Sequence, residues 1–343
     1  MKIACVNCGQ PYPDSGVPYK CPNCGGLFDY AESLSLNHNP SSINQISLGE
    51  GNAPLVDAKV FGREVYFKCE YLNPTGSFKD RGTSALISLL VSRGIKEAIE
   101  DSSGNAGASF AAYAARAGIK ARVYAPESAS GPKRKQIEAY GAELILISGP
   151  RSKASEAVMQ AAESGMIYAS HAYLPFNLPG YATCAYEIFE QLGCEPGAVV
   201  VPAGQGGFLL GVARGFEALL HADKIQQMPV MVGVQASACA PLYELWKNGT
   251  MDDIQESPTV AEGVRTRWPV RAKAVVEITR RSGGRFVSVD EAYILSGRDA
   301  LARLGFYVEP TSALAWRALE ESILTLPDPV VVVLTGSGLK YLS

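Results

Sequence analysis

The sequence has 343 residues, of which 47% are hydrophobic and 19% are charged, and its net charge is −3. A globular chain of this length is long enough for two domains, each with its own hydrophobic core. The charge argues against nucleic acid as the main partner, because binding to phosphates requires an excess of Lys and Arg.

The N-terminal sequence MKIACVNCGQ lacks the apolar region of a signal peptide. No run of about 18 apolar residues is present, so we expect no membrane-spanning helix and no membrane partner. The sequence therefore predicts a cytoplasmic protein.

Four cysteines in the first 24 residues form the pairs Cys5-x2-Cys8 and Cys21-x2-Cys24, which are separated by 12 residues. In a long chain of cytoplasmic type, such clustering favours a metal over disulfides. Four thiolates at this spacing predict a tetrahedral zinc site, and this zinc would be structural because no position is left for water. We therefore expect residues 1–30 to form a zinc ribbon.

Residues 31–55 are rich in Ser, Asn and Pro and are interpreted as a linker. Beyond them, apolar β-branched runs alternate with helical patterns. The predicted strands are Ala121–Ala125, Leu144–Ile147, Met166–Ala169, Ala198–Val201, Val230–Val234, Arg285–Val289 and Val330–Leu334. The predicted helices are Ser77–Arg93, Ala106–Ala117, Ser152–Ser164, Tyr181–Leu192, Gly207–Leu220, Asp290–Leu304 and Thr311–Leu324. This alternation predicts an α/β fold with mostly parallel sheets covered on both faces, and ligands bind at the carboxyl ends of such strands.

The first chemical motif is Asn73-Pro-Thr-Gly-Ser-Phe-Lys79-Asp-Arg-Gly82, a turn followed by an amphipathic helix. Lys79 falls in the first turn of that helix, where the helix dipole disfavours a cation. A lysine in this position loses its proton more readily and can become the amine of a Schiff base. A solvated surface lysine is the alternative interpretation.

The second motif, Ser102-Ser-Gly-Asn105-Ala-Gly107, follows the strand-like Glu97–Asp101 and opens a helix of small residues. Such a turn presents backbone N–H groups and hydroxyls to an anion, although an ordinary serine N-cap would look the same.

Two glycine-rich turns follow later strands. Gly204-Gln-Gly-Gly207 leads from a buried strand into a helix, a geometry that binds phosphate. It is not a dinucleotide fingerprint, because Leu209 stands where the third glycine would be, and no Walker motif follows. Thr335-Gly-Ser-Gly338 comes after the last apolar strand and brings a hydroxyl to the carboxyl edge of the sheet.

In this order, the four motifs resemble the pyridoxal-5'-phosphate (PLP) enzymes of the tryptophan synthase β fold type, and among them the threonine synthases. The resemblance covers roughly residues 45–343, and some members also carry a pair of zinc knuckles. It implies a lyase that eliminates or replaces a β or γ substituent of an amino acid, converting O-phosphohomoserine to threonine. It also implies a homodimer with a large PLP-binding domain (31–82 and 178–343) and a small substrate-side domain (83–177).

The resemblance also implies the role of each motif. Lys79 would form the Schiff base and move protons, and Asn105 would contact the phenolic oxygen of PLP. The remaining expected site residues are Gly204, Gln205, Gly206 and Gly207 for the phosphate, Thr335 for the pyridine nitrogen, and Ser102, Ser103, Gly104 and His171 for the substrate. A hydroxyl at the pyridine nitrogen leaves the ring near neutral, which favours loss of a substituent over transamination.

The chain departs from threonine synthases at the residues that bind the substrate phosphate. Ala106 stands where those enzymes commonly have Thr. Their N-S-x-N-P-x-R-L-E-G-Q-K-T block corresponds to His171–Thr183, in which Ala172, Asn177 and Ala182 replace the serine, arginine and lysine. Leaving a phosphate dianion without these partners is costly.

Two alternatives therefore remain open. Thr259–Val264 and Val308–Ala313 resemble segments of serine/threonine dehydratases, which favours a deaminating lyase or a β-replacement enzyme for a non-phosphorylated amino acid. The second alternative is a non-catalytic zinc-ribbon protein on an inactive PLP scaffold. The intact Lys79, Asn105 and Thr335 argue against this alternative. His171 is either a substrate contact or a structural histidine.

Overall fold

The computed structural model describes residues 2–36, 46–127, 131–149 and 151–341. Residues 37–45 of the predicted linker lie outside this range. The chain forms two compact units. Within the described residues, the first unit consists of Met1–Glu50 and Lys79–Gly180, and the second consists of Gly51–Phe78 and Tyr181–Tyr341. None of the described helices is long and apolar enough to span a bilayer.

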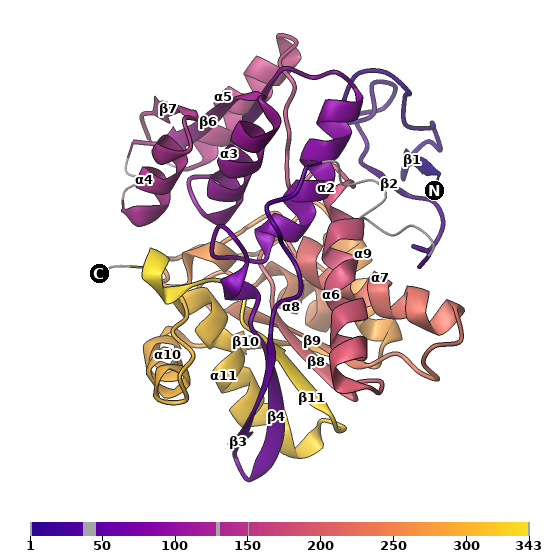
Figure 1. Ribbon diagram of the computed structural model, residues 1–343, viewed down its shortest axis with the longest axis vertical. Coiled ribbons are helices and arrows are strands. Elements are labelled where there is room, and N and C mark those ends of the chain that lie inside the picture. The colour runs from indigo at the N-terminus through magenta and orange to yellow at the C-terminus, as the bar shows by residue number, and fades with distance from the viewer. Residues whose placement is uncertain (1, 37–45, 128–130, 150, 342–343) are drawn as a thin grey trace. The chain divides into compact units, whose positions relative to one another are not determined.

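The first unit contains a parallel three-stranded sheet of order β5-β6-β7 and a small antiparallel pair, β1-β2 (Figure 1). Its strands are β1 (Ile3–Cys5), β2 (Phe28–Tyr30), β5 (Glu97–Glu100), β6 (Lys120–Pro126) and β7 (Glu143–Ile147). Its helices are α2 (Lys79–Ser92), α3 (Asn105–Ala117), α4 (Pro132–Ala139) and α5 (Arg151–Glu163), and α6 (Asn177–Leu192) begins in this unit.

Side chains of the three-stranded sheet alternate between two apolar layers. Ala98 of β5 packs with α2 and α3, whereas the next residue, Ile99, packs with Val158 of α5. Successive side chains on a strand point to opposite faces, so a strand that is apolar at both positions requires cover on both sides. The sequence-based expectation of a sheet covered on both faces is therefore confirmed for this unit.

The N-terminal cysteine segment packs on the body of the first unit through aromatic residues. The ring of Tyr12 lies 4.6 Å from that of Phe28 and 5.1 Å from that of Phe176. Tyr19 lies 5.2 Å from Tyr168, measured between ring centroids. These edge-on contacts anchor the segment beside the residues that precede α6.

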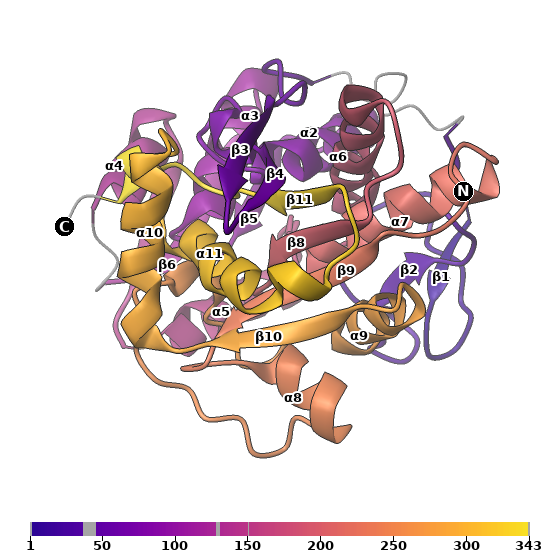
Figure 2. The ribbon, with the colours of Figure 1, turned by 90° about the horizontal axis from the view of Figure 1, so that it is seen from below.

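The second unit is built on one six-stranded sheet of order β10-β9-β8-β11-β4-β3, which can be followed in Figure 2. Only β3 runs antiparallel to its neighbour. The strands are β3 (Leu55–Val60), β4 (Arg63–Lys68), β8 (Ala198–Pro202), β9 (Val230–Ala236), β10 (Arg285–Val289) and β11 (Val330–Val333). The helices are the rest of α6, α7 (Gly207–His221), α8 (Pro241–Asn248), α9 (Ala272–Arg281), α10 (Ile294–Arg303) and α11 (Pro310–Ser322).

Both faces of this sheet are also covered. Val232 and Val234 of β9 belong to the apolar core that contains Leu314 of α11. A Cβ atom on the intervening Gly233 would approach Leu209 of α7 to 3.1 Å. Helices α11 and α7 therefore lie on opposite faces of β9, because alternate residues point in opposite directions.

The structure differs from the sequence-based prediction in a few elements. Met166–Ala169 is not a strand; only Tyr168 forms an isolated bridge, to Ile99. The hairpin β3–β4 was not predicted, because β3 is an edge strand whose residues are mostly exposed and lack an apolar pattern. Helices α8 and α9 were also missed.

Candidate active site

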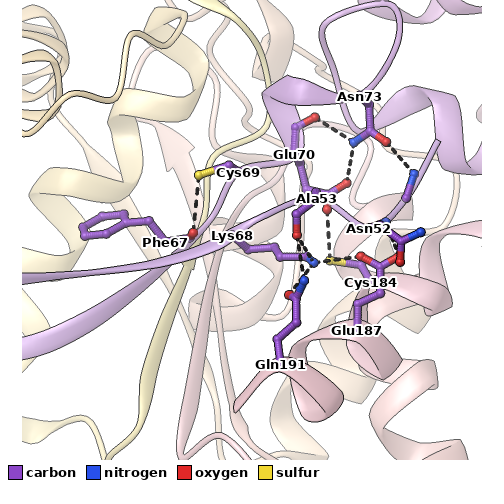
Figure 3. A network of polar contacts seen from close by, with 11 residues as sticks. Asn52, Ala53, Phe67, Lys68, Cys69, Glu70, Asn73, Cys184, Glu187 and Gln191 are labelled. Carbon is purple, nitrogen blue, oxygen red and sulfur yellow. Dashed lines mark hydrogen bonds and ion pairs between the residues drawn. The ribbon is translucent and has the colours of Figure 1, made fainter. Parts of the chain in front are cut away.

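The lysine motif follows β4 and is held by a buried polar network (Figure 3). Asn73 donates from Nδ2 to the backbone oxygen of Glu70 at 2.8 Å and to its carboxylate at 2.9 Å. Its Oδ1 accepts the Gly51 N–H at 2.9 Å. Asn73 thereby fixes the start of the turn that leads to Lys79, a positioning role that the motif alone did not reveal.

The same turn pairs with the C-terminal glycine-rich segment. Phe78 donates its N–H to the Thr335 oxygen at 3.1 Å, and Ser337 donates to the Gly76 oxygen at 3.0 Å. Gly76 has a φ of +85°, a conformation that favours glycine. Lys79 follows Phe78 and is the first residue of α2. The sequence-based prediction that Lys79 lies in the first turn of this helix is therefore confirmed.

Thr335 is held by Ser312, a residue that the sequence analysis did not single out. Both residues are buried. The Ser312 Oγ accepts the N–H groups of Thr335 and Gly336 at 2.9 and 3.0 Å, and it lies 3.0 Å from the Thr335 Oγ1. The only sequence signal was its location within Val308–Ala313. Ser312 fixes both the backbone and the hydroxyl that were predicted to face the cofactor ring.

The glycine loop Gly204–Gly207 connects β8 to α7. Gly206 is the N-cap of α7 with a φ of +76°, and no side chain in the described part of the chain caps this helix. A Cβ on Gly207 would meet no atom within 4 Å. Backbone N–H groups at an uncapped helix start, beside open space, are the groups that bind a phosphate.

The glycine loop is packed closely against a segment that resembles the dehydratases. A Cβ on Gly204 would lie 2.8 Å from the Gly263 oxygen, so only glycine fits. Gly263 in turn donates its N–H to the Thr311 Oγ1 at 3.2 Å. The Gln205 side chain is already used, because its Oε1 accepts the Val270 N–H at 3.2 Å. Its role is to shape the loop.

Three of these segments follow neighbouring strands. β4, β11 and β8 are adjacent and parallel, and they lead into the lysine motif, the Thr335 turn and the glycine loop, respectively. Adjacent strands lie about 4.8 Å apart, and their carboxyl ends form one edge of the sheet. Ligands of parallel α/β sheets bind at this edge. The second unit therefore brings a glycine loop at an uncapped helix start and the buried residue Thr335 to one edge.

In the first unit, Ser102–Asn105 connects β5 to α3. The N-cap of α3 is Gly104, and no side chain in the described residues caps the helix, so the alternative of an ordinary serine cap is wrong. Ser102 Oγ instead accepts the Gly104 N–H at 3.2 Å. A Cβ on Gly107 would lie 1.7 Å from the Ser102 oxygen, which explains the glycine. This turn presents the first N–H groups of α3 to an anion such as a carboxylate.

His171 lies beside that turn. Its Nδ1 is 2.5 Å from Oε1 of Glu100, the last residue of β5, and the other oxygen of Glu100 accepts the Ser102 N–H at 2.5 Å. Glu100, Asp101 and His171 are close enough to share a metal ion, but the oxygens of Asp101 accept the hydroxyls of Tyr168 and Ser155 at 2.7 Å. The sequence analysis missed the carboxylate that joins His171 to the turn.

The block that departs from threonine synthases, His171–Thr183, is mostly buried and contains no Lys or Arg. Asn177 begins α6 and is 1% exposed, and within the described residues neither Oδ1 nor Nδ2 of its amide has a hydrogen-bond partner. Ala182 is buried. A buried amide without partners is unusual and costly, so this position is suited to a polar ligand atom rather than to packing.

The four N-terminal thiols lie together in the first unit. Cys8 Sγ lies 3.7 Å from that of Cys21 and 3.4 Å from that of Cys24, and Cys24 lies 3.5 Å from Cys5. A tetrahedron with zinc–sulfur bonds of about 2.3 Å has edges of about 3.8 Å, close to these distances. Hydrogen bonds from the backbone of Gln10 and the Asn23 side chain lower the pKa of Cys8 to about 6, whereas the neighbouring thiols Cys8 and Cys5 raise the pKa of Cys24 to about 12. Of these two thiols, Cys8 is the one that favours a thiolate.

A model of the family described as "Pyridoxal-phosphate dependent enzyme" matches residues 46–336. The threonine synthase of Methanocaldococcus jannaschii is 33% identical, over 99% of this chain and 93% of its own length. That of Synechocystis sp. is 36% identical, over 86% and 78%. Among solved structures, a threonine deaminase of T.th. has a TM-score of 0.74 at 28% identity, covering 90% of this chain and all of that one.

Proposed function

We propose a role for each candidate residue, given that this chain belongs to the pyridoxal-phosphate dependent enzyme family. It is a PLP-dependent lyase similar to threonine synthase, and its α/β fold is of the tryptophan synthase β type. One observation supports the proposed roles best: β4, β11 and β8 end at the same edge of the sheet. The lysine motif, Thr335 and the glycine loop begin there.

Each of these segments has a proposed role in holding PLP. Lys79 binds the cofactor covalently, and Gly204–Gly207 bind its phosphate through the uncapped N–H groups of α7. Thr335, fixed by Ser312, meets the pyridine nitrogen, and Asn105 contacts the phenolic oxygen. When bound, PLP withdraws electrons from the substrate Cα, so that its proton is lost and a β or γ substituent can leave.

The other residues act on the amino-acid substrate. Ser102, Ser103 and Gly104 bind its carboxylate at the uncapped start of α3. Lys79 is the base that removes the Cα proton, because an amine at a helix start loses its own proton readily. Replacement of Lys79 by Ala tests both roles: the absorption band of lysine-bound PLP should be lost, and an unchanged spectrum would remove Lys79 from the site.

For the reaction, the printed name of the relatives, threonine synthase, supports threonine as the product. The resemblance of the motifs adds O-phosphohomoserine as the first candidate substrate. A non-phosphorylated amino acid is the second candidate. It is favoured by one observation, the unpartnered buried amide of Asn177 where threonine synthases carry an arginine. A neutral amide cannot balance a phosphate dianion, whereas it can hydrogen-bond to a hydroxyl or an acyl group.

Absorbance titration of the holoenzyme with O-phosphohomoserine, L-threonine, L-serine and O-phosphoserine, with product assays alongside, separates these candidates. Formation of threonine and phosphate from O-phosphohomoserine supports the first. An oxoacid or a replacement product from another amino acid alone supports the second. A colourless protein, even with added PLP, would instead support a binding protein on an inactive scaffold.

We also propose that Cys5, Cys8, Cys21 and Cys24 bind one structural zinc ion, which the sulfur–sulfur distances support. The homodimer remains a prediction from the resemblance, and the cytoplasmic location remains a prediction from the sequence. Elemental analysis of freshly reduced protein tests the zinc proposal, and absence of metal would contradict it.

A further inference from the structure

Glu100 joins two parts of the candidate active site in the first unit. It ends β5 and its side chain is 1% exposed. One carboxylate oxygen contacts Nδ1 of His171 at 2.5 Å, and the other accepts the N–H of Ser102 at 2.5 Å. The carboxylate that fixes the turn for the substrate carboxylate therefore also fixes the imidazole.

This geometry determines which nitrogen of His171 carries a proton. An ionised carboxylate only accepts hydrogen bonds, so Nδ1 must be the donor and carry the hydrogen. In the neutral ring, Nε2 then has a lone pair and can accept a proton. In the charged ring, Nε2 carries the proton that can be donated. The His171 side chain is 14% exposed, unlike Glu100, so part of its ring remains accessible.

The surroundings of the pair are polar and already ordered. Tyr168 and Ser155 donate their hydroxyls to Asp101, each at 2.7 Å. Glu100 is the carboxylate that contacts Nδ1 of His171, and it therefore orients the ring. A histidine that is oriented by a buried carboxylate and is itself partly exposed has the arrangement of a general acid or base.

We propose that His171 is the proton donor to the leaving group and that Glu100 is its positioning residue. This inference rests on the proposed lyase function and defines its substrate class as an amino acid with a β- or γ-hydroxyl. Removal of the adjacent C–H proton leaves an electron pair that forms a new carbon–carbon double bond. At the same time the bond between the substrate carbon and the hydroxyl oxygen breaks, and its electron pair goes to the oxygen. The proton on Nε2 of the charged His171 is transferred to that oxygen, so that water leaves and the imidazole becomes neutral.

The rest of the site supports this assignment. A phosphate leaves as a stable anion and needs cations more than a proton donor, and this chain has Ala172, Asn177 and Ala182 where threonine synthases have the serine, arginine and lysine. A hydroxide is a poor leaving group and must be protonated as it departs. These three positions therefore lack the groups for the first kind of leaving group, and the Glu100–His171 pair is suited to the second.

The orientation of His171 can be measured by nitrogen NMR of histidine-labelled holoenzyme, without any turnover. The chain has only three histidines, and the His171→Asn variant identifies the signals of His171. We expect the neutral ring to carry its proton on Nδ1. In Glu100→Gln, the amide oxygen keeps the Ser102 N–H and the amide nitrogen faces His171, so the proton should move to Nε2. A tautomer that is the same in both proteins would overturn the positioning role.

The proton-donor role is tested with L-serine and 3-chloro-L-alanine, which differ only in the leaving group. His171→Asn keeps a donor toward Glu100 but has no titratable nitrogen. We expect its kcat for L-serine to fall by about 10²-fold or more, as for loss of a general acid. Chloride needs no proton, so kcat for 3-chloro-L-alanine should change less than about threefold. Equal losses for both substrates, or no loss for L-serine, would overturn the proposal.

The controls separate this inference from the proposed function. A wild-type protein that shows no band of lysine-bound PLP contradicts the lyase assignment, and the tautomer measurement still decides the role of Glu100. Glu100→Gln should lower kcat for L-serine more than kcat for 3-chloro-L-alanine. If the band is normal and Glu100→Asp does not recover at least part of the L-serine rate lost in Glu100→Gln, the positioning role is wrong. Ser155→Ala, which removes one hydrogen bond to the neighbouring Asp101, is the matched control and should leave the ratio of the two rates unchanged.

Discussion

Replacement of Lys68 by Met should destabilise the protein by removing a buried cation (Figure 3). Lys68 is the last residue of β4, and its side chain is 0% exposed. Its Nζ donates to the Ala53 oxygen at 2.6 Å, to Glu187 at 2.7 Å and to the Gln191 Oε1 at 2.8 Å. Three acceptors match the three protons of an ammonium group, and Met keeps the length of the apolar stem.

The expected magnitude follows from what Met leaves behind. The Glu187 carboxylate, which is 15% exposed, keeps its hydrogen bond from the Asn52 N–H at 2.8 Å but loses the Lys68 cation. Breaking a buried ion pair by removing one partner costs about 3–5 kcal/mol. At about 2–4 °C per kcal/mol for a domain of this size, Tm should fall by about 6–20 °C.

Thermal and urea unfolding of the holoenzyme measure this effect. Lys59→Met, on the exposed edge strand β3, is the matched control and should change the free energy of unfolding by less than about 0.5 kcal/mol. The double variant Lys68→Met with Glu187→Leu should recover part of the loss, because replacing both partners also removes the carboxylate that the single variant leaves without its cation. A loss below about 1 kcal/mol in the single variant would refute the reasoning.

Three further predictions concern other parts of the molecule. Burial raises the pKa of Glu50, but hydrogen bonds from Ser84 and Tyr113 outweigh it and hold the pKa below its usual value. The contribution of Glu50 to stability is therefore complete above about pH 4.5 and is lost as the pH falls through the lowered pKa. Acid titration of stability in Glu50→Gln should show a smaller decrease between about pH 5 and 3 than in the wild type. Ser312→Ala should shift the absorption band of bound PLP and lower kcat, because Thr335 loses its partner; an unchanged spectrum and rate would contradict this role. Cys8→Ser should reduce zinc to well below one ion per chain and lower Tm while PLP still binds, and full zinc occupancy in the variant would contradict the proposed ligand set.

The alternation of strands and helices was predictable because buried parallel strands are continuous apolar runs. Val330–Val333 and Ala198–Pro202 are buried along their whole length, and both were found within one residue of their observed bounds. The edge hairpin and Met166–Ala169 were not predicted correctly. An exposed edge strand carries little apolar signal, and a short apolar run can equally be a loop that packs against a sheet.

The site could be predicted only as far as its residues lie in recognisable motifs. Lys79, Thr335 and the glycine loop stand in short segments whose chemistry is local. Ser312 and Glu100 act through hydrogen bonds to residues that are distant in sequence or belong to a different loop. Such pairs depend on which strand edges the fold brings together, and no local pattern encodes that.

The position of β11 in the six-stranded sheet has a consequence for biosynthesis. β11 is the last strand in chain order, yet it lies between β8 and β4. During translation, the strands that carry the glycine loop and the lysine motif therefore emerge long before the strand that joins them. The segments of the first unit, in contrast, are all synthesised by Gly180. We expect a ribosome-bound chain to form the first unit early and to complete the six-stranded sheet of the second unit only after residues 330–333 have left the ribosome.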